Sequence, residues 1–552
     1  MPFFLFSATS GQIADKLEKS LLTRWVKLFE VGVMLLAGWG FLANRFWPLV
    51  GALVLMGMHS TVFGPVKYAY LPQHLQQNEL VGGNGMMEMG TFVAILLGEV
   101  LGAALATLPR GGLITSATLV SIAALGLWTS WGVPVSPAAD PGLRINWNPI
   151  SETWRNLRFA QGNRVVWLSL LGISWFWFFG ATLLAQFPTF AKEILGGDES
   201  VFILLLTVFS LGIGLGSLLC EKLSGHKVEI GLVPFGALGL TLFGIDLFLA
   251  CRGPVATVPA LHFEAFLGLA RHWRLLADLV LLGLFGGFYI VPLYALIQTR
   301  SERSHQSRII AANNILNALF MVASAVVSML LFRAGLTIPQ LFLAAALFNL
   351  VVAGYIIALV PEFLARFLSW LLVHSVYRLD AEHTERIPEA GAALLVCNYV
   401  SRVDVLLLLA VSPRPIRFIL DQRFFRLPLL GSILRLIKAI PASPDPDRMA
   451  LVRREIERTF AEGDLVALFP EGEPQEAGQI GEFEAHLAPL LVQEQVPVLP
   501  MALGGGLWGS CFARTGARPA GAVGARISLR VGLPLDPGAA PASLRSLLQA
   551  LV

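Results

Sequence analysis

Two short segments in the last third of the chain combine residues that can do acid–base chemistry with strand-like runs that would position them. The first, Asn398–Asp404, follows the apolar run Ala393–Val396 and carries a phenol, a hydroxyl and a carboxylate. The second, Phe469–Gly472, ends the run Leu465–Leu468 and places Glu471 on a turn. Such short apolar runs alternate with charged helical stretches, which is typical of an α/β domain.

Tyr399 is poorly suited to proton abstraction. A phenol has a reference pKa of about 10, so at neutral pH it stays protonated unless its surroundings perturb it strongly. Histidine is the more usual general base. His486 is the nearby histidine that could take this role, but it lies in a different segment, and we interpret it as a surface residue.

The first segment resembles the glycerolipid acyltransferase signature N-H-x-S-x-x-D, with Tyr399 at the histidine position. Three further stretches, Arg417–Gly431, Phe469–Gly472 and Val496–Leu503, resemble later blocks of that family. The resemblance implies that the histidine takes a proton from a glycerol hydroxyl as it attacks an acyl thioester, and that the aspartate orients the ring. It implies catalytic positions at Tyr399 and Asp404, and substrate-binding positions at Ser401, Arg417, Arg423, Glu471, Gly472 and Pro500.

The chain also departs from this family where phosphate-binding cations are common. Gln475 and Glu476 stand where fused family members carry Thr-Arg, and Glu484 stands where another arginine is common. Anions near a phosphate site would repel the substrate, more strongly as water is excluded. With Tyr399, these changes predict an impaired acyltransferase kept as a lipid-handling domain. An active enzyme with a non-standard base is the alternative.

The composition places the rest of the chain in a membrane. The 552 residues are 55% hydrophobic and 14% charged, with a mean hydropathy of +0.68. Lys and Arg number 40 against 37 Asp and Glu, so the net charge of +3 indicates no nucleic-acid partner. Four cysteines without a C-x-x-C pair indicate neither a metal site nor a disulfide framework.

About ten apolar windows are long enough to cross a bilayer. The first ten residues are apolar but too short to span, and they continue into Gly11–Lys16, as half a helix would. We expect the chain to start inside a transmembrane helix, by natural truncation or a misplaced start codon. The windows lie near residues 29–45, 47–65, 87–108, 113–133, 164–188, 200–220, 229–250, 276–297, 309–333 and 338–360.

The basic residues indicate the orientation. Lys and Arg gather in alternate loops, near residues 16–27, 144–164, 222–227 and 300–308, whereas the opposite loops hold roughly half as many. The basic loops should be cytoplasmic. On this count the last span ends inside, and everything after Pro361 is cytoplasmic.

The apolar part resembles bacterial lysophospholipid transporters of the major facilitator superfamily. The resemblance rests on Gly11–Lys16, Phe63–Gln73, Leu80–Asn84 and Ile309–Ala318. It implies a twelve-helix fold, and we expect its first helix to be missing here. The glycines of Gly212–Ser217 lie inside an apolar span, where they favour close helix packing. Ionisable residues inside the spans are costly in lipid and are default path residues, which makes Glu88 and Glu99 transport candidates. The segments that carry the resemblance add Asp15, Lys67, Asn313 and Asn314.

We therefore expect a polytopic all-α membrane domain of the major facilitator type followed by a cytoplasmic α/β acyltransferase-like domain. The predicted boundaries are 1–361 for the transporter domain, with helix bundles at 1–135 and 162–361, then an amphipathic interfacial linker at 362–385 and the acyltransferase-like domain at 386–552.

The resemblance implies a fused protein of the bacterial inner membrane. Lysophospholipid would cross the membrane and be re-acylated from acyl-CoA or acyl carrier protein, with no bound cofactor and no metal. Its partners would be membrane lipids and acyl carrier protein, with no nucleic acid. A non-catalytic, lipid-binding membrane protein is a further alternative.

Overall fold

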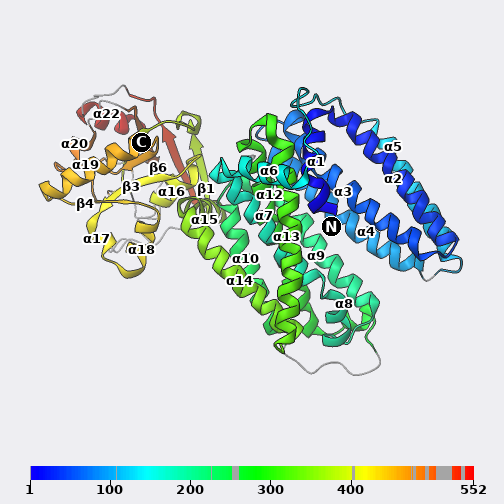
Figure 1. The fold of residues 1–552 in the computed structure, drawn as a ribbon. Helices are drawn as coiled ribbons and strands as arrows, with labels where there is room; N and C mark the ends of the chain where they lie inside the picture. Colours follow the sequence, from blue (N-terminus) through cyan, green and yellow to red (C-terminus); the bar gives the residue numbers. More distant parts are fainter. Residues whose placement is uncertain are drawn as a thin grey trace. The chain divides into compact units, whose positions relative to one another are not determined.

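A computed structural model describes residues 2–106, 108–225, 227–251, 260–400, 404–473, 475, 480–491, 496–504, 525–535 and 541–551. The chain divides into two compact units, Met1–Gly354 and Tyr355–Val552. The first unit is built of helices and the second contains a β-sheet (Figure 1).

The first unit is entirely helical. Among the described residues, ten helices are long and apolar enough to cross a membrane, as the apolar windows predict. The last of these helices ends a few residues inside the second unit. The helix α1 is shorter, about 22 Å for its 15 residues. The elements are α1 (Pro2–Lys16), α2 (Lys19–Leu42), α3 (Phe46–His74), α4 (Leu80–Ala106), α5 (Gly111–Ser130), α6 (Pro149–Gln161), α7 (Arg164–Leu184), α8 (Phe187–Thr189), the π-helix η1 (Phe190–Ile194), α9 (Glu199–Ser224), α10 (Leu232–Ala250), α11 (Phe263–Leu267), α12 (Ala270–Arg300), the 3₁₀ helix η2 (Arg303–His305), α13 (Gln306–Arg333) and α14 (Ile338–Leu359).

Polar caps define where several of these helices begin. The Glu18 carboxylate accepts from the backbone N–H groups of Ser20 and Leu21, both at 2.8 Å, which satisfies two donors of the first turn of α2. Asn148 and Asn163 cap α6 and α7 in the same way. Partial burial pushes the pKa of Glu18 upward, but these hydrogen bonds and one from the Ser136 N–H outweigh it and lower that pKa to about 2.

Glycines let the helices of this unit approach closely. An added Cβ at Gly212 of α9 would lie 2.2 Å from the Val280 carbonyl oxygen of α12, and one at Gly283 would lie 2.3 Å from the Phe209 carbonyl oxygen. On the other side of α9, a Cβ at Gly85 of α4 would lie 2.5 Å from the Ser217 carbonyl oxygen. The prediction of close helix packing for the Gly212–Ser217 glycines is confirmed.

The second unit is built on a seven-stranded sheet with the strand order β1-β7-β6-β2-β5-β3-β4. The pairing is parallel except between β6 and β7. The strands are β1 (Tyr377–Glu382), β2 (Ala393–Cys397), β3 (Ile416–Asp421), β4 (Ile440–Ala442), β5 (Leu465–Leu468), β6 (Val498–Gly504) and β7 (Ala525–Val531).

Helices cover both faces of this sheet, so its central strands are apolar on both sides. Alternate residues of β2 illustrate this, since Leu395 packs with the helices of one face and Leu394 with those of the other. The first face carries α15 (Pro361–Val376), α16 (Asp404–Val411), α17 (Gln422–Phe425) and α18 (Pro428–Leu436), and the second carries α19 (Pro446–Ala461), α20 (Ala488–Leu491) and α22 (Pro541–Leu551), while η3 (Thr384–Arg386) follows β1.

The region predicted as a linker at 362–385 belongs to this folded unit. Phe367 and Val373 of α15 are 1% and 2% exposed, and Val373 lies in the same apolar core as the sheet. Tyr377 begins the edge strand β1, which pairs with β7. The amphipathic pattern of α15 is also typical of an interfacial helix, and sequence alone does not show that its apolar side meets a sheet.

Candidate functional site

The residues of the acyltransferase-like motifs gather at the carboxyl edge of the parallel strands. Tyr399 follows β2, Glu471 follows β5 and Asp421 ends β3. Ligands commonly bind at this edge in α/β proteins. A cavity of about 30 Å³ lies there, with room for roughly one or two water molecules. Its lining is Tyr399, Ile419, Leu420, Asp421, Phe424, Ala442, Phe469, Gly472, Glu484, His486 and Leu487.

Tyr399 is held from several sides. Its backbone N–H donates to Glu471 Oε2 at 2.6 Å, its carbonyl accepts from the Gln475 N–H at 2.7 Å, and its ring stacks on Phe469 with centroids 4.8 Å apart. The side chain is 4% exposed. A phenol in this buried aromatic setting is well packed, and nothing in the described contacts gives it the features of a base.

The Glu471 side chain is buried and binds two backbone N–H groups. Its second oxygen accepts from the Gly481 N–H at 2.8 Å, and the side chain is 4% exposed. Burial raises the pKa of Glu471, and the two N–H donors oppose this effect without cancelling it. The neighbouring Gly472 has φ of +69°, a left-handed conformation that glycine adopts at little cost.

Asp404 and Asn398 also bind backbone groups. Asp404 begins α16, is 2% exposed and accepts from the Val400 N–H at 2.7 Å. Asn398 exchanges two hydrogen bonds with the Leu503 backbone, at 2.7 and 3.0 Å, and so joins β2 to β6. Asp404 therefore fixes the turn that follows β2. Ser401, predicted to bind substrate in this turn, lies outside the described residues.

The structure separates the two predicted arginines. Arg417 is the second residue of β3, at the amino end of the sheet, where its guanidinium donates to Glu462 and Asp464 at 2.5 and 2.7 Å. Arg423 lies just after β3, close to Asp421 and Glu473, and its side chain is 70% exposed. Arg423 is thus placed near the cavity, and Arg417 is not. Pro500, the last predicted residue of this set, is buried in β6 opposite Val396 of β2.

A histidine–carboxylate pair that the motifs do not contain lies at the same cavity. His486 Nδ1 is 2.9 Å from Glu484 Oε2, and both residues line the cavity with Tyr399. The His486 side chain is 22% exposed, and its Nε2 bonds to none of the described residues. His486 is therefore a partly exposed residue at the rim of this cavity. An imidazole with Nδ1 on a carboxylate has Nε2 available to accept a proton.

Gly472 makes this pair possible. A Cβ at Gly472 would lie 2.3 Å from Glu484 Oε1, so a larger residue would push that carboxylate away from its present position. The Glu484 N–H also donates to the Pro470 carbonyl at 2.8 Å. The sequence contains one signal for this pair, which is that Glu484 lies two residues before His486. The signal does not show that the pair reaches the cavity, because that depends on the contact between Glu484 and Pro470 in the fold.

In the helical unit, Asp15 pairs with a residue far along the chain. Arg308 Nε lies 3.0 Å from Asp15 Oδ2, and the two side chains are 2% and 0% exposed. Asp15 Oδ1 also accepts from the Ser307 N–H at 3.1 Å, and Asp140 lies 3.7 Å from Arg308. The partner of Asp15 is thus supplied by α13. The ion pair fastens α1 to α13.

A second polar cluster lies deeper, between α3 and α4 on one side and α12 on the other. Tyr68 donates to Glu88 at 2.5 Å, and its ring stacks on Tyr294 at 4.3 Å. Asn84 and Gln298 exchange amide hydrogen bonds at 2.5 and 3.0 Å. Glu88 is 1% exposed. We call this set, Tyr68, Glu88, Asn84, Tyr294 and Gln298, the inter-helix polar cluster.

Of the other transport candidates, some lie beside this cluster and others lie elsewhere. Lys67 lies near Glu88 and donates to Thr91 at 2.6 Å, and Asn313 is buried beside Tyr294. Asn314 contacts Gly64 of α3. Glu99 is exposed on α4 and does not join Glu88, although the two share a helical face.

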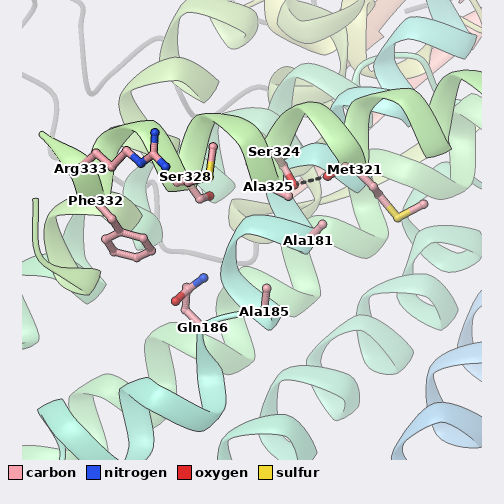
Figure 2. A pocket seen from close by; sticks show the side chains of 10 residues that line it. Ala181, Ala185, Gln186, Met321, Ser324, Ala325, Ser328, Phe332 and Arg333 are labelled. Atoms are coloured by element: carbon pink, nitrogen blue, oxygen red, sulfur yellow. Dashed lines mark hydrogen bonds between the residues drawn. The ribbon is translucent and has the colours of Figure 1, made fainter.

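Figure 2 shows a larger pocket, of about 590 Å³, between the ends of α7 and α13. Most of its lining is apolar or small, and it is bounded by Gln186, just after α7, and by Arg333 in the last turn of α13. It lies at the opposite end of α13 from Arg308. Its lining is Ala181, Ala185, Gln186, Met321, Ser324, Ala325, Ser328, Met329, Phe332 and Arg333.

Within the described residues, no group of three or more His, Cys, Asp or Glu side chains could hold a metal ion. The described cysteines, Cys220, Cys251 and Cys397, are free thiols. Burial raises the pKa of Cys397 well above its ordinary value, which makes this thiol unreactive.

Comparisons with known proteins match both units. Residues 1–270 match the Major Facilitator Superfamily model, and residues 378–504 match the Acyltransferase model. The chain is 30% identical over 315 residues to the lysophospholipid transporter LplT of Escherichia fergusonii, covering 55% of this chain and 70% of that protein. It is 31% identical over 311 residues to LplT of Klebsiella pneumoniae, with the same shares.

A solved structure agrees with the fold of the helical unit. The human organic anion transporter MFSD10 superposes with a TM-score of 0.52 at 14% identity, over 64% of this chain and 81% of that chain. The sequence matches show that the chain belongs to the lysophospholipid transporter LplT family of the major facilitator superfamily and carries a C-terminal domain of the acyltransferase family.

Proposed function

We propose that the chain moves lysophospholipid across the bacterial inner membrane and that its C-terminal domain handles the same lipid for re-acylation at the cytoplasmic face. The observation that carries the proposal is the presence, in one chain, of an LplT-type membrane unit and an acyltransferase domain. A transporter that delivers a lipid with one free hydroxyl suits a domain that would acylate it. Acyl-CoA or acyl carrier protein would supply the acyl group.

The pocket between α7 and α13 has the chemistry for such a lipid. Its apolar wall suits a single acyl chain, and Arg333 offers a guanidinium to a phosphate at one end. Within the described residues Arg333 makes no ion pair. The Asp15–Arg308 pair closes α1 onto α13 at the other end. Because the Arg308 end carries the basic loops, we assign it to the cytoplasm and the pocket to the opposite side.

Acyl transfer at the motif position is impaired in this proposal. Tyr399 supplies a buried phenol instead of an imidazole, and the neighbouring carboxylates of Glu471 and Asp404 bind backbone N–H groups. The fold of the site therefore persists, while the group that would take the hydroxyl proton is missing from its usual place.

The His486–Glu484 pair favours a second candidate, an active acyltransferase with a non-standard base. In that case Nε2 of His486 takes the proton of the lysophospholipid hydroxyl, and the hydroxyl oxygen attacks the thioester carbonyl. The carbon–sulfur bond breaks, and the imidazolium returns the proton to the leaving thiolate.

One set of assays tests these alternatives. Purified full-length chain and its Tyr399→His and His486→Gln variants are incubated with radiolabelled acyl-CoA and a panel of lysophospholipids. The impaired-domain proposal expects little transfer by the wild type and a gain of roughly 100-fold in Tyr399→His, since a positioned base contributes about 10²–10⁴-fold. Strong wild-type activity that His486→Gln abolishes would replace it with the second candidate. Silence in all three proteins supports a non-catalytic lipid-binding role.

Transport is measured separately in proteoliposomes with a labelled lysophospholipid. Arg333→Gln should raise the KM roughly 5-fold, about 1 kcal/mol for an exposed charge contact. Arg45→Gln is the matched control, because Arg45 is an exposed arginine outside the pocket. Absence of lysophospholipid movement by the wild type would overturn the transport half, whatever the acylation result.

A further inference from the structure

An apolar stripe lies on the outer side of α18 and the residue before it. Leu427, Leu430, Ile433 and Leu436 recur at every third position, and they are 50%, 38%, 52% and 44% exposed. We call these four residues the α18 stripe. Large apolar side chains gathered on one exposed helix side indicate a surface that contacts something other than water.

The stripe cannot turn inward, because the opposite side of α18 is already occupied. Leu434 and Ile437 are 4% and 7% exposed and belong to the core under the sheet. Gly431 lies so close to α17 that an added Cβ would be 2.2 Å from the Phe425 carbonyl oxygen. The helix is thus fixed in rotation with its stripe outward.

Cations border the stripe. Arg426 and Arg435 are exposed, and neither makes an ion pair with the described residues. The Arg435 guanidinium donates to the Phe425 carbonyl at 3.2 Å, which anchors it beside the stripe without neutralising it. An apolar surface with a cationic border complements the acyl and headgroup layers of an anionic bilayer. It disfavours pairing of two copies, which would bring like charges together.

The end of α18 is tied to the point where the chain leaves the membrane. Lys438 Nζ lies 2.6 Å from Glu362 Oε1 in the first turn of α15. That helix begins at Pro361, directly after Val360, and the last spanning helix α14 ends at Leu359. The ion pair therefore holds the α18 end within a side chain's reach of the membrane exit.

We propose that the α18 stripe docks on the surface of the same bilayer, with Leu427, Leu430, Ile433 and Leu436 in the acyl boundary and Arg426 and Arg435 on anionic phospholipid headgroups. This surface would hold the carboxyl edge of the sheet at the membrane, because α17 and α18 follow β3 directly and Phe424 of α17 lines the cavity. The proposal rests on the chain spanning a membrane and not on its transport or acyl transfer.

The test uses the full-length chain with its four native cysteines replaced by alanine, a spin label at Ile433→Cys, and lipid nanodiscs containing phosphatidylglycerol. Power saturation should show the label accessible to oxygen and protected from a water-soluble nickel chelate. A label at Leu451→Cys is the matched control, because Leu451 is an exposed leucine, 63% exposed, on the helix α19 that covers the other sheet face. It should show the opposite pattern.

Removing the cations gives a quantitative check. Arg426→Gln with Arg435→Gln should lower the docked-to-undocked ratio roughly 30-fold, since each cation near an anionic surface contributes about 1 kcal/mol. Hydrogen exchange of the unaltered chain provides a measurement free of substitutions, and α18 should be protected in anionic discs relative to neutral discs while α19 is unchanged.

The proposal is overturned if the label at 433 behaves like the label at 451. It is also overturned if the label at 433 is shielded from both oxygen and nickel, because a protein surface would then cover the stripe. Either result leaves the transport and acyl-transfer assays to be judged on their own outcomes.

Discussion

Replacing Asp15 by asparagine removes one charge of the buried pair that fastens α1 to α13. The substitution keeps the size of the side chain, and an amide can still accept from the Ser307 N–H. What is lost is the charge opposite Arg308, whose guanidinium is 2% exposed. We therefore expect the contact between α1 and α13 to open more often.

The structure gives a magnitude for this effect. Removing one partner of a buried ion pair costs about 3–5 kcal/mol, because the other charge is left buried. Arg308 keeps its hydrogen bond to the Ser304 carbonyl at 2.7 Å and has Asp140 at 3.7 Å, so the lower end applies. About 3 kcal/mol corresponds to roughly a 150-fold change in the ratio of open to closed forms.

A cysteine at position 307 reports on this opening. Ser307 is fully buried, and Ser307→Cys changes the side chain little. In a cysteine-depleted chain in nanodiscs, the rate at which an impermeant thiol reagent labels position 307 follows the open population. Asp15→Asn should raise that rate by about two orders of magnitude. Asp140→Asn is the control, since Asp140 is the 36% exposed partner and should change the rate less than roughly 5-fold.

Equal labelling rates in the two variants would refute this reasoning. The pair would then stabilise α1 itself rather than its contact with α13. A rate increase in Asp15→Asn that disappears when Arg308→Gln is added would identify the coupling as the one between these two side chains.

Three further predictions concern single residues. Glu88→Gln should lower lysophospholipid transport in proteoliposomes at least tenfold. A carboxyl in the membrane interior is costly, so its presence beside Tyr68 indicates a role in transport. Because the pKa of Glu471 is raised, its contribution to stability is complete below the ordinary pKa of 4.5 and is lost as the pH rises through the raised value. Glu471→Gln should therefore flatten the fall in unfolding temperature over that window. Gly472→Ala should lower the unfolding free energy by at least about 1 kcal/mol, since φ is +69° and the Cβ would displace Glu484, and chemical denaturation measures it.

The sequence predicted the elements well where one local property decides them. Ten apolar stretches became ten helices, and the runs Ala393–Val396 and Leu465–Leu468 became neighbouring strands, because length and hydrophobicity are local. The strand at 377–382 was not predicted, because a short polar edge strand is defined by its pairing with β7 and not by its own sequence pattern.

The candidate sites were predicted only in part, since their partners are distant in sequence. The motifs located Tyr399 and Gly472, which line one cavity, and Glu471, which binds the Tyr399 backbone, but Arg417 lies at the other end of its strand. Arg308 is 293 positions from Asp15, and no pattern joins them. His486 reaches the cavity through a fold-dependent approach to Pro470, for which spacing gives little signal.

The glycine contacts of α9 have a mechanical consequence. Where α9 meets α12, main chain rests on main chain from both directions, at Gly212 and at Gly283, so these helices have no side-chain layer that could be compressed or rearranged. We therefore expect α9 and α12 to move together as one rigid body. The crossing of α9 with α4 at Gly85 is also a backbone contact, and it joins a helix of the first predicted bundle to a helix of the second. Among the described residues, four glycines bring α9 and α12 into backbone contact, at Gly212, Gly216, Gly283 and Gly287, against one at the α4–α9 crossing. We therefore expect a movement between the two bundles to occur at the α4–α9 crossing and to leave the α9–α12 contact unchanged.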